Sequence, residues 1–292
     1  MTLAQLQVFI AVAEAKSFTR AADTLSFTQS AVSQMILSLE KELGVPLFNR
    51  GRKGVSTTAI GERMLKQARE ILQIISCMKQ EASASKGIET GTLRIGSIHT
   101  VSTRLLPCLI GSFRKLYPQV EIVLFEGEYA EVNSWITSSV VDVAFTTKPA
   151  PEMDYTRLTR DEMMVFVPED HPLRHEPSLT FSQIQDKCFL MPKDECIKKL
   201  LLDHGLASTI TLEVRDVTTL LAMVQEWVGV TILPELYMPE TLPRVVAIPL
   251  RPAITRELVI ATRSFDQISP VAAEFILHTQ HYLNMHGPAP AP

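Results

Sequence analysis

The chain has 292 residues, of which 46% are hydrophobic and 21% are charged, as in ordinary globular proteins. Its formal net charge of -4 excludes overall basicity as the basis of nucleic-acid binding, so such a function would need a local basic patch. No apolar run reaches the ~18–20 residues that a membrane span needs, and the N-terminus lacks the pattern of an export signal.

The first 44 residues predict three helices. Apolar residues at helical spacing predict a first helix from Leu3 to about Ala15. Ser17 and Thr28 are suited to cap two further helices, over 18–25 and 28–43, and Gly44 ends the last one. A short turn before the third helix is typical of a helix-turn-helix.

A basic hairpin is expected next. The segment LFNRGRKGVST, residues 47–57, reads as two short strands around a turn, because its glycines interrupt helical structure. Residues 1–58 carry six basic and four acidic side chains, which leaves them at +2 and the rest of the chain at -6. Three of the six cations lie between Arg50 and Lys53, so the basic character is concentrated in this hairpin, which we interpret as a wing.

A long helix over residues 59–85 is predicted to start after Thr58. Six apolar residues follow each other in steps of 4-3-4-3-4, the period of a coiled-coil seam: Met64, Ala68, Ile71, Ile75, Met78 and Ala82. We favour a dimerisation helix over one more core helix, since Leu65, Leu72 and Ile74 add apolar surface beside the seam. Residues 85–91 read as a linker.

Beyond residue 91, strands and helices alternate with short connections, which predicts parallel α/β structure. The pattern indicates two lobes, with the last helix, 269–285, returning to the first lobe. The tail from residue 286 is expected to be disordered. The expected strands are 92–98, 121–127, 141–147, 163–169, 188–193, 209–215, 229–234 and 256–262, and the expected helices are 102–117, 130–138, 195–204 and 218–227.

The stretch SFTRAADTLSFTQSAVSQMILSLEKELGVPLFNRGRKGVSTTAIG, residues 17–61, closely resembles the winged helix-turn-helix of LysR-type transcriptional regulators. Further on, GTLRIG, FRKLYPQVEIVLFEG, VDVAFTT and ILPE are similar to the effector domain of that family. The resemblance implies a DNA-binding dimer joined by the long helix and commonly assembled into a tetramer. It also implies a periplasmic-binding-protein-like domain that senses a small molecule between two lobes.

The expected fold class is therefore α/β with an N-terminal all-α winged helix-turn-helix, a long linker and dimerisation helix, and a two-lobed α/β effector domain. The expected boundaries are 1–58 for the DNA-binding domain, 59–87 for the linker helix and 88–292 for the effector domain. Within the last, lobe I takes about 91–160 and 266–287, and lobe II takes about 161–265.

The third helix carries the groups expected to read DNA. Gln29, Ser30, Ser33 and Gln34 can donate and accept hydrogen bonds in a major groove, and Thr28 caps the helix end that can meet a phosphate. Leu37 and Ser38 depart from the family, which often has Lys or Arg there.

Positive charge for phosphate contacts is expected from Arg20, Arg50, Arg52 and Lys53. For Arg50 the alternative is a salt bridge to Glu40 or Glu42.

The effector is expected near the carboxyl ends of the strands, where two-lobed α/β domains bind ligands. Gly127 to Tyr129 lie at one such end, and the turn 191–196 at another. Polar groups before a helix favour an anionic ligand. For His99 the alternative is an ordinary loop histidine, and for Lys193 a solvated lysine. The predicted effector-binding residues are Ser97, His99, Thr100, Ser102, Thr146, Thr147, Lys193 and Cys196.

Cys196 at a helix start resembles the peroxide-sensing branch of the family, so a redox-responsive regulator is an alternative. The resolving cysteine expected some residues later is missing. The four cysteines, Cys77, Cys108, Cys188 and Cys196, lack CxxC spacing, which favours a reducing compartment and a cytoplasmic protein.

Trp227 stands where the family often has glycine, and two outcomes are open: it narrows the cleft or packs between the lobes. His171 and His175 are flanked by prolines in a turn, so no metal site is expected there. No catalytic signature or cofactor motif is present, and we expect no enzyme and no cofactor. The competing class is a solute-binding or enzymatic α/β protein whose N-terminal helices form an interaction module.

Overall fold

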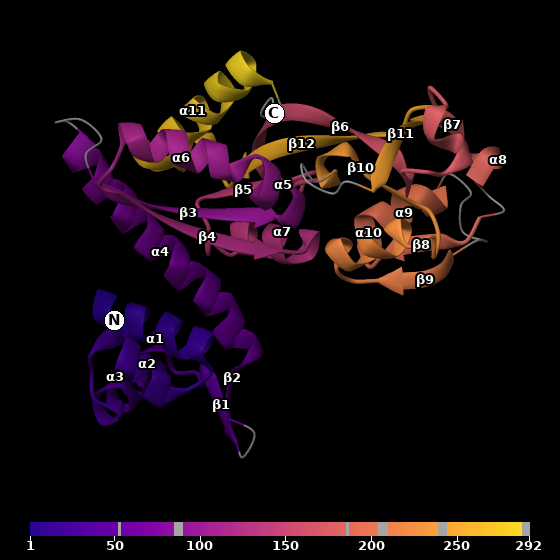
Figure 1. Cartoon of the computed structure of the whole chain (residues 1–292). Coiled ribbons are helices and arrows are strands. Elements are labelled where there is room, and N and C mark those ends of the chain that lie inside the picture. The colour runs from indigo at the N-terminus through magenta and orange to yellow at the C-terminus, as the bar shows by residue number, and fades with distance from the viewer. Residues whose placement is uncertain (52–53, 85–89, 185–186, 204–209, 239–243, 288–292) are drawn as a thin grey trace.

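The computed structural model describes the chain except residues 52–53, 85–89, 185–186, 204–209, 239–243 and 288–292. A small helical domain, one long helix and a two-lobed α/β domain follow each other along the chain (Figure 1). No helix in the described ranges is long and apolar enough to cross a membrane.

The N-terminal domain is a winged helix-turn-helix. The predicted caps are confirmed: the Ser17 side chain accepts from the N–H of Arg20, the Thr28 side chain accepts from the N–H of Ala31, and Gly44 ends the third helix at φ +70°. Its elements are α1 (Leu3–Ala15), α2 (Phe18–Leu25), α3 (Gln29–Leu43), β1 (Phe48–Gly51) and β2 (Gly54–Thr57).

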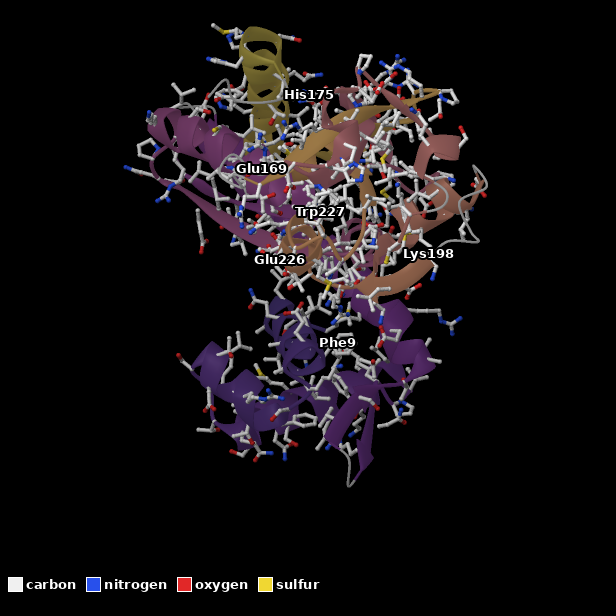
Figure 2. The ribbon with its side chains drawn as sticks, turned by 45° about the vertical axis from the view of Figure 1, so that its right-hand side comes forward. Phe9, Glu169, His175, Lys198, Glu226 and Trp227 are labelled. Atoms are coloured by element: carbon white, nitrogen blue, oxygen red, sulfur yellow. The ribbon has the colours of Figure 1, made fainter. Side chains whose placement is uncertain are left out.

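Aromatic and aliphatic side chains from all parts of this domain share one core. The ring of Phe9 on α1 meets that of Phe48 on β1 edge-on at 5.4 Å, and Ile36 and Leu39 on α3 are fully buried. Figure 2 labels Phe9 within this domain. The core fixes the orientation of α3, because its apolar face must point inward.

The long helix α4 (Ala59–Ala84) starts at Thr58, whose hydroxyl accepts from the N–H of Gly61 at 2.9 Å. Gly61 lies so close to the wing that an added Cβ would collide with the carbonyl oxygen of Leu47. This close approach explains why glycine stands near the start of a helix, where it is otherwise unfavourable.

The predicted seam of α4 is only partly correct. Ala68 is 2% exposed and packs with Leu65 in the core of the DNA-binding domain, because the first half of α4 covers that domain. Exposed apolar side chains occur in the second half, at Ile71, Ile74 and Met78. The apolar surface available to a partner is therefore this shorter stripe.

The second half of α4 also contacts the effector domain. Glu70 pairs with Arg263 at 3.0 Å, and the Gln73 amide donates to Asp142 at 3.4 Å. The linker helix is thus joined to both functional domains of the same chain.

Lobe I contains a parallel sheet in the order β4-β3-β5, flanked by helices (Figure 1). The predicted helix 102–117 is two helices that meet at Leu105, the first beginning earlier than expected. The elements are β3 (Gly91–Ile98), α5 (His99–Arg104), α6 (Leu106–Leu116), β4 (Val120–Gly127), α7 (Tyr129–Thr137), β5 (Val143–Thr146), η4 (Phe265–Gln267) and α11 (Pro270–His286).

Lobe II is built on a mixed set of strands. Strands β8 and β9 are parallel, but β10 and β11 pair antiparallel with β6. Its elements are η1 (Pro172–His175), β7 (Leu179–Thr180), α8 (Phe181–Ile184), β8 (Phe189–Pro192), α9 (Glu195–Asp203), β9 (Ile210–Val214), α10 (Val217–Gln225), β10 (Thr231–Pro234), η3 (Glu235–Tyr237) and β11 (Val245–Arg251).

Two antiparallel strands, β6 (Asp154–Pro168) and β12 (Thr255–Thr262), connect the lobes. The expected parallel pairing therefore holds within each lobe, at β4-β3-β5 and at β8-β9, but not for the connecting strands, since β12 runs antiparallel to both β5 and β6. The expected end of lobe II near 265 is also too late: Leu258 and Ile260 of β12 belong to the core of lobe I. The lobe II core spans Met163 to Ile254.

Candidate functional site

The outer face of α3 is polar and accessible. Val32, Ile36 and Leu39 are fully buried on the inner face, and Met35 packs against the same core, so the polar residues of the helix lie on the other side. Gln29, Ser30 and Gln34 are exposed and Ser33 is half-buried. The Thr28 hydroxyl caps the helix and lies 3.0 Å from the Ser30 hydroxyl. The structure thus brings the predicted base-reading residues onto the first turns of one accessible helix.

The structure describes two of the predicted phosphate-binding cations, Arg20 and Arg50, and their surroundings differ. Arg20 on α2 is exposed. Arg50 on the wing pairs with Glu40 at 3.4 Å and lies over the ring of Phe18 at 4.9 Å, so the salt bridge considered as its alternative does form. Arg52 and Lys53 lie outside the described residues.

A cavity of about 520 Å³ lies between the two lobes. Its walls come from the loops that follow β3 and β4 in lobe I and β8 and β9 in lobe II. These loops all sit at carboxyl ends of parallel strands, as expected for ligand binding in such folds. The lining residues are Ile98, His99, Gly127, Glu128, Tyr129, Ala130, Pro192, Lys193, Asp194, Arg215, Asp216, Val217 and Tyr237.

A buried arginine lies behind this cavity. Arg256 on β12 is 8% exposed and donates to Asp161 of β6 from Nε at 2.9 Å and from Nη2 at 2.7 Å. The same guanidinium donates to the Tyr129 hydroxyl at 2.6 Å and to the Thr100 hydroxyl at 3.2 Å. Arg256 also lies over the ring of Tyr237, a residue of the cavity lining, at 5.9 Å, and burial raises the pKa of the Tyr237 phenol. This network ties two helices of lobe I to the strands that connect the lobes.

The charged groups of the cavity have both signs. Lys193 and Arg215 are basic, whereas Glu128, Asp194 and Asp216 are acidic. Arg215 of lobe II lies 3.8 Å from Glu128 of lobe I, so this pair spans the cleft between the lobes.

The acidic side chains also cap helices in the cavity wall. Asp216 accepts from the side chain and the N–H of Thr219 on α10, and these hydrogen bonds hold the pKa of Asp216 below its ordinary value. Asp194 accepts from the N–H of Ile197 at 3.0 Å, and Glu128 caps α7. The starts of α7, α9 and α10 therefore carry carboxylates of the protein itself. At α5, which also starts at this cavity, the N-cap residue Ile98 makes no side-chain cap hydrogen bond.

The predicted effector-binding residues divide into four groups. His99 and Lys193 line the cavity, and His99 is 3.0 Å from Glu126. Thr100 is buried behind the wall, beside Arg256. The side chain of Cys196 lies outside the described residues.

The fourth group, Ser97, Ser102, Thr146 and Thr147, also does not line the cavity. The Ser97 hydroxyl is buried and donates to the carbonyl of Ile98, while those of Ser102 and Thr146 are buried without a hydrogen-bond partner among the described residues. Thr146 is the last residue of a strand in which every residue is buried, so its side chain points into packed protein. The sequence predicts correctly where these strands end, but it does not predict which side chains at those ends face the cavity.

Sequence reasoning missed Arg215, Asp216, Tyr237 and Arg256. Arg215 ends a predicted strand and Asp216 lies between that strand and a predicted helix, so the rule that selected His99 would have found them. Arg256 gave no such signal, because it lies inside a strand and reaches the cavity wall only through contacts between distant segments.

Trp227 follows α10 on lobe II and does not line the cavity (Figure 2). Its indole Nε1 donates to Asp170 at 3.0 Å, and its ring lies 5.3 Å from that of His171. Both partners belong to the turn after β6 in the same lobe. Neither outcome considered for Trp227 is therefore correct: it does not narrow the cleft, and it does not pack between the lobes.

The described residues contain no group of three or more His, Cys, Asp or Glu side chains arranged to hold a metal ion. Cys77, Cys108 and Cys188 are free thiols.

Comparisons with known families cover almost the whole chain. Residues 3–62 match the family described as bacterial regulatory helix-turn-helix protein, lysR family, and residues 86–283 match the LysR substrate binding domain. The HTH-type transcriptional regulator YvbU of Bacillus subtilis (strain 168) is 36% identical over an aligned length of 286, and the alignment covers 94% of this chain and 97% of that protein.

Solved structures show the same architecture. A full-length OxyR variant from Pseudomonas aeruginosa superimposes with a TM-score of 0.79 at 25% identity, covering 96% of this chain and 97% of that one. Full-length CbnR in complex with its target DNA has a TM-score of 0.65 at 23% identity and covers 96% of this chain and 99% of that one, which shows a shared fold.

Proposed function

The chain belongs to the LysR family of bacterial transcriptional regulators, and from that premise we propose how its own residues bind DNA and effector. It is a DNA-binding regulator with an effector-binding domain, so the alternative of a solute-binding or enzymatic protein with an N-terminal interaction module is set aside. We propose that it acts in the cytoplasm, where its DNA target lies, and that it has no catalytic activity.

The observation that carries the DNA-binding assignment is the accessible polar face of α3. Gln29, Ser30, Ser33 and Gln34 present neutral groups to base edges. Thr28 caps the helix start, the end of α3 that can meet a phosphate of the DNA backbone. The positioning charge comes from Arg20 and from the wing residues Arg50, Arg52 and Lys53. The Glu40 pair of Arg50 holds that guanidinium beside α3, where it is still 41% exposed.

The effector is proposed to bind in the 520 Å³ cavity. The sequence alone favoured an anion, and His99, Lys193 and Arg215 can pair with one. The carboxylates of Glu128, Asp194 and Asp216 favour a ligand that also has a cationic group. The charges of the cavity therefore fit a small molecule that carries both signs. Such a ligand contacts both lobes and stabilises one arrangement of them.

The chain is further proposed to dimerise through α4, within the range 59–87, and to assemble into a tetramer. The exposed stripe Ile71, Ile74 and Met78 supports the pairing of two copies of this helix. The redox alternative gains no support from the described cysteines.

Gel retardation by the full-length protein tests the DNA-binding assignment, with the promoter region beside its own gene as probe. Gln29→Ala and Ser33→Ala should relax base preference. Arg20→Ala and Arg50→Ala should weaken binding to every sequence, and each should reduce the salt slope by about 1, because one phosphate is no longer neutralised. Gln67→Ala, on an exposed position of α4, is the control. Absence of retardation at low salt would contradict the assignment.

A thermal-shift screen of the full-length protein tests the effector assignment. Amino acids and simple mono- and dicarboxylic acids are the probes. Amino acids should give the larger rise in unfolding temperature, and Lys193→Ala should reduce it. A rise given only by the dicarboxylic acids would contradict the need for a cationic group.

A further inference from the structure

One large apolar side chain stands on the outer face of α3. Leu37 is 44% exposed, whereas Val32, Ile36 and Leu39 of the same helix are fully buried. An exposed aliphatic side chain on an otherwise polar helix face is available to contact another molecule. Leu37 is not among the side chains that form or pack against the core of the domain, so it is free to make a contact outside the chain.

Helical geometry places Leu37 among the proposed base-reading residues. It follows Ser33 by four residues and Ser30 by seven, and residues at these spacings share one face of a helix. At 1.5 Å per residue, Leu37 lies about 10 Å along the axis from Ser30, which is two helical turns. A helix that presents Ser30 and Ser33 to bases therefore presents Leu37 to the same groove.

An aliphatic side chain can make one kind of favourable specific contact in that groove. It neither donates nor accepts hydrogen bonds, and it gains nothing from a phosphate. The C5-methyl group of thymine is the apolar feature that base pairs display there. We propose that Leu37 is a specificity-determining residue, which contacts a thymine methyl group in each half-site bound by a dimer. This inference rests on the proposed DNA-binding role of α3.

Uracil substitution tests the contact directly, because deoxyuridine differs from thymidine only by the missing methyl group. Duplexes are first selected from a random pool by the full-length protein, and each thymine is then replaced singly by deoxyuridine. Removal of a buried methyl group should lower affinity about fourfold at one thymine per half-site. Replacing both should lower it roughly tenfold or more, since separate positions add.

Three variants separate Leu37 from its neighbours. Leu37→Ala should bind thymine and uracil duplexes equally. Leu37→Lys should lose the thymine preference, bind more tightly to all sequences and steepen the salt slope by about 1. Ser38→Ala, exposed on the next position of α3, should keep the uracil sensitivity of the unchanged protein. All three should keep the normal unfolding temperature, because the altered side chains are outside the core.

The outcomes that overturn the proposal are distinct from failure of the proposed function. A protein that selects sequences but binds uracil and thymine duplexes equally lacks the methyl contact. Uracil sensitivity that persists in Leu37→Ala assigns the contact to another residue, for example Ala31. A protein that selects no sequence at all would remove the DNA-reading role of α3 and this inference together.

Discussion

Trp227 has an unusual backbone conformation for a large residue. Its φ is +61°, in the left-handed region that favours glycine, and its side chain is 51% exposed. The hydrogen bond from its indole to Asp170 and its ring contact with His171 hold it in place. The tryptophan thus fastens the end of α10 to the turn after β6, a structural role inside lobe II.

His171 beneath this ring should make lobe II sensitive to acid. It is 6% exposed, and burial, assisted by the positive charge of Lys187, lowers the pKa of its imidazole from 6.5. Its Nδ1 accepts from the N–H of Leu173 at 3.2 Å, which requires the neutral ring. Below pH 6.5 the unfolded chain binds a proton that folded His171 binds less readily, so stability should fall as the pH drops toward the folded-state pKa.

His171→Asn should remove this component of the pH dependence. An asparagine oxygen can still accept from the Leu173 N–H, although asparagine has no ring to pack against Trp227. Urea unfolding at pH 7.5 and pH 5.5 measures the difference in unfolding free energy between the two conditions. His175→Asn, in the same turn but exposed, is the control and should leave that difference unchanged. An equal pH dependence in His171→Asn would assign the effect to other groups.

At the scale of elements, periodicity predicted helices better than strands. The wing and α1 to α4 lie within a residue or two of their expected bounds, because caps and apolar spacing are local signals. The strand β6 is much longer than expected: its first half, from Asp154, is polar and largely exposed, so it lacked an apolar pattern. The antiparallel pairing of β12 depends on segments distant in sequence, and local patterns do not contain that information.

The partial error at α4 has a similar cause. A 4-3 repeat shows that one side of a helix is apolar but does not say what covers it. In the structure Leu65 and Ala68 are covered by the domain of the same chain, and this leaves the later positions exposed.

The strand pair β6 and β12 should depend strongly on its buried ion pair. Arg256→Ala leaves Asp161, whose side chain is 1% exposed, without its counter-charge, and a buried pair broken in this way costs roughly 3–5 kcal/mol. Chemical unfolding of the full-length protein should show a decrease of this size in the stability of the effector domain.

Arg157→Ala provides a matched control on the same two strands. Arg157 pairs with Glu257 across β6 and β12, but its side chain is 71% exposed. Its removal should cost about 0–1 kcal/mol, as for other surface pairs. Equal effects of the two variants would show that burial of Asp161 and Arg256 does not matter for stability.

At the scale of the whole molecule, the location of the cavity could be predicted but its composition only in part. Strand ends pointed to His99, Gly127 to Tyr129 and Lys193, which do line it. The charge of Arg215 on lobe II meets that of Glu128 on lobe I only after both lobes have folded and face each other. The hydroxyl of Ser97 is buried in the protein and does not face the cavity. Packing on the two sides of a strand determines which hydroxyls are buried in this way.

The stripe on α4 should determine the oligomeric state. Ile74→Glu places a charge on a side chain that is 54% exposed in the single chain and that we expect to be buried between two α4 helices. The variant should shift the protein toward monomer in analytical ultracentrifugation at micromolar concentration, with the unfolding temperature of the DNA-binding domain unchanged. Gln67→Glu, on the same helix, should leave the assembly intact. An unaltered distribution in Ile74→Glu would place the dimer contact elsewhere.

The way in which the two lobes are connected also affects how a protein of this kind can evolve. The chain enters lobe II after Glu162 and leaves it before Thr255, and these two residues are direct neighbours in the register of β6 and β12. Lobe II is therefore a continuous insert whose two ends lie side by side, the arrangement that tolerates exchange of one module for another. Transplanting a different lobe II at this point would replace the walls bearing Lys193, Arg215 and Asp216 while leaving the linker contacts of lobe I untouched. New ligand preferences could arise in this way without rebuilding the DNA-binding half.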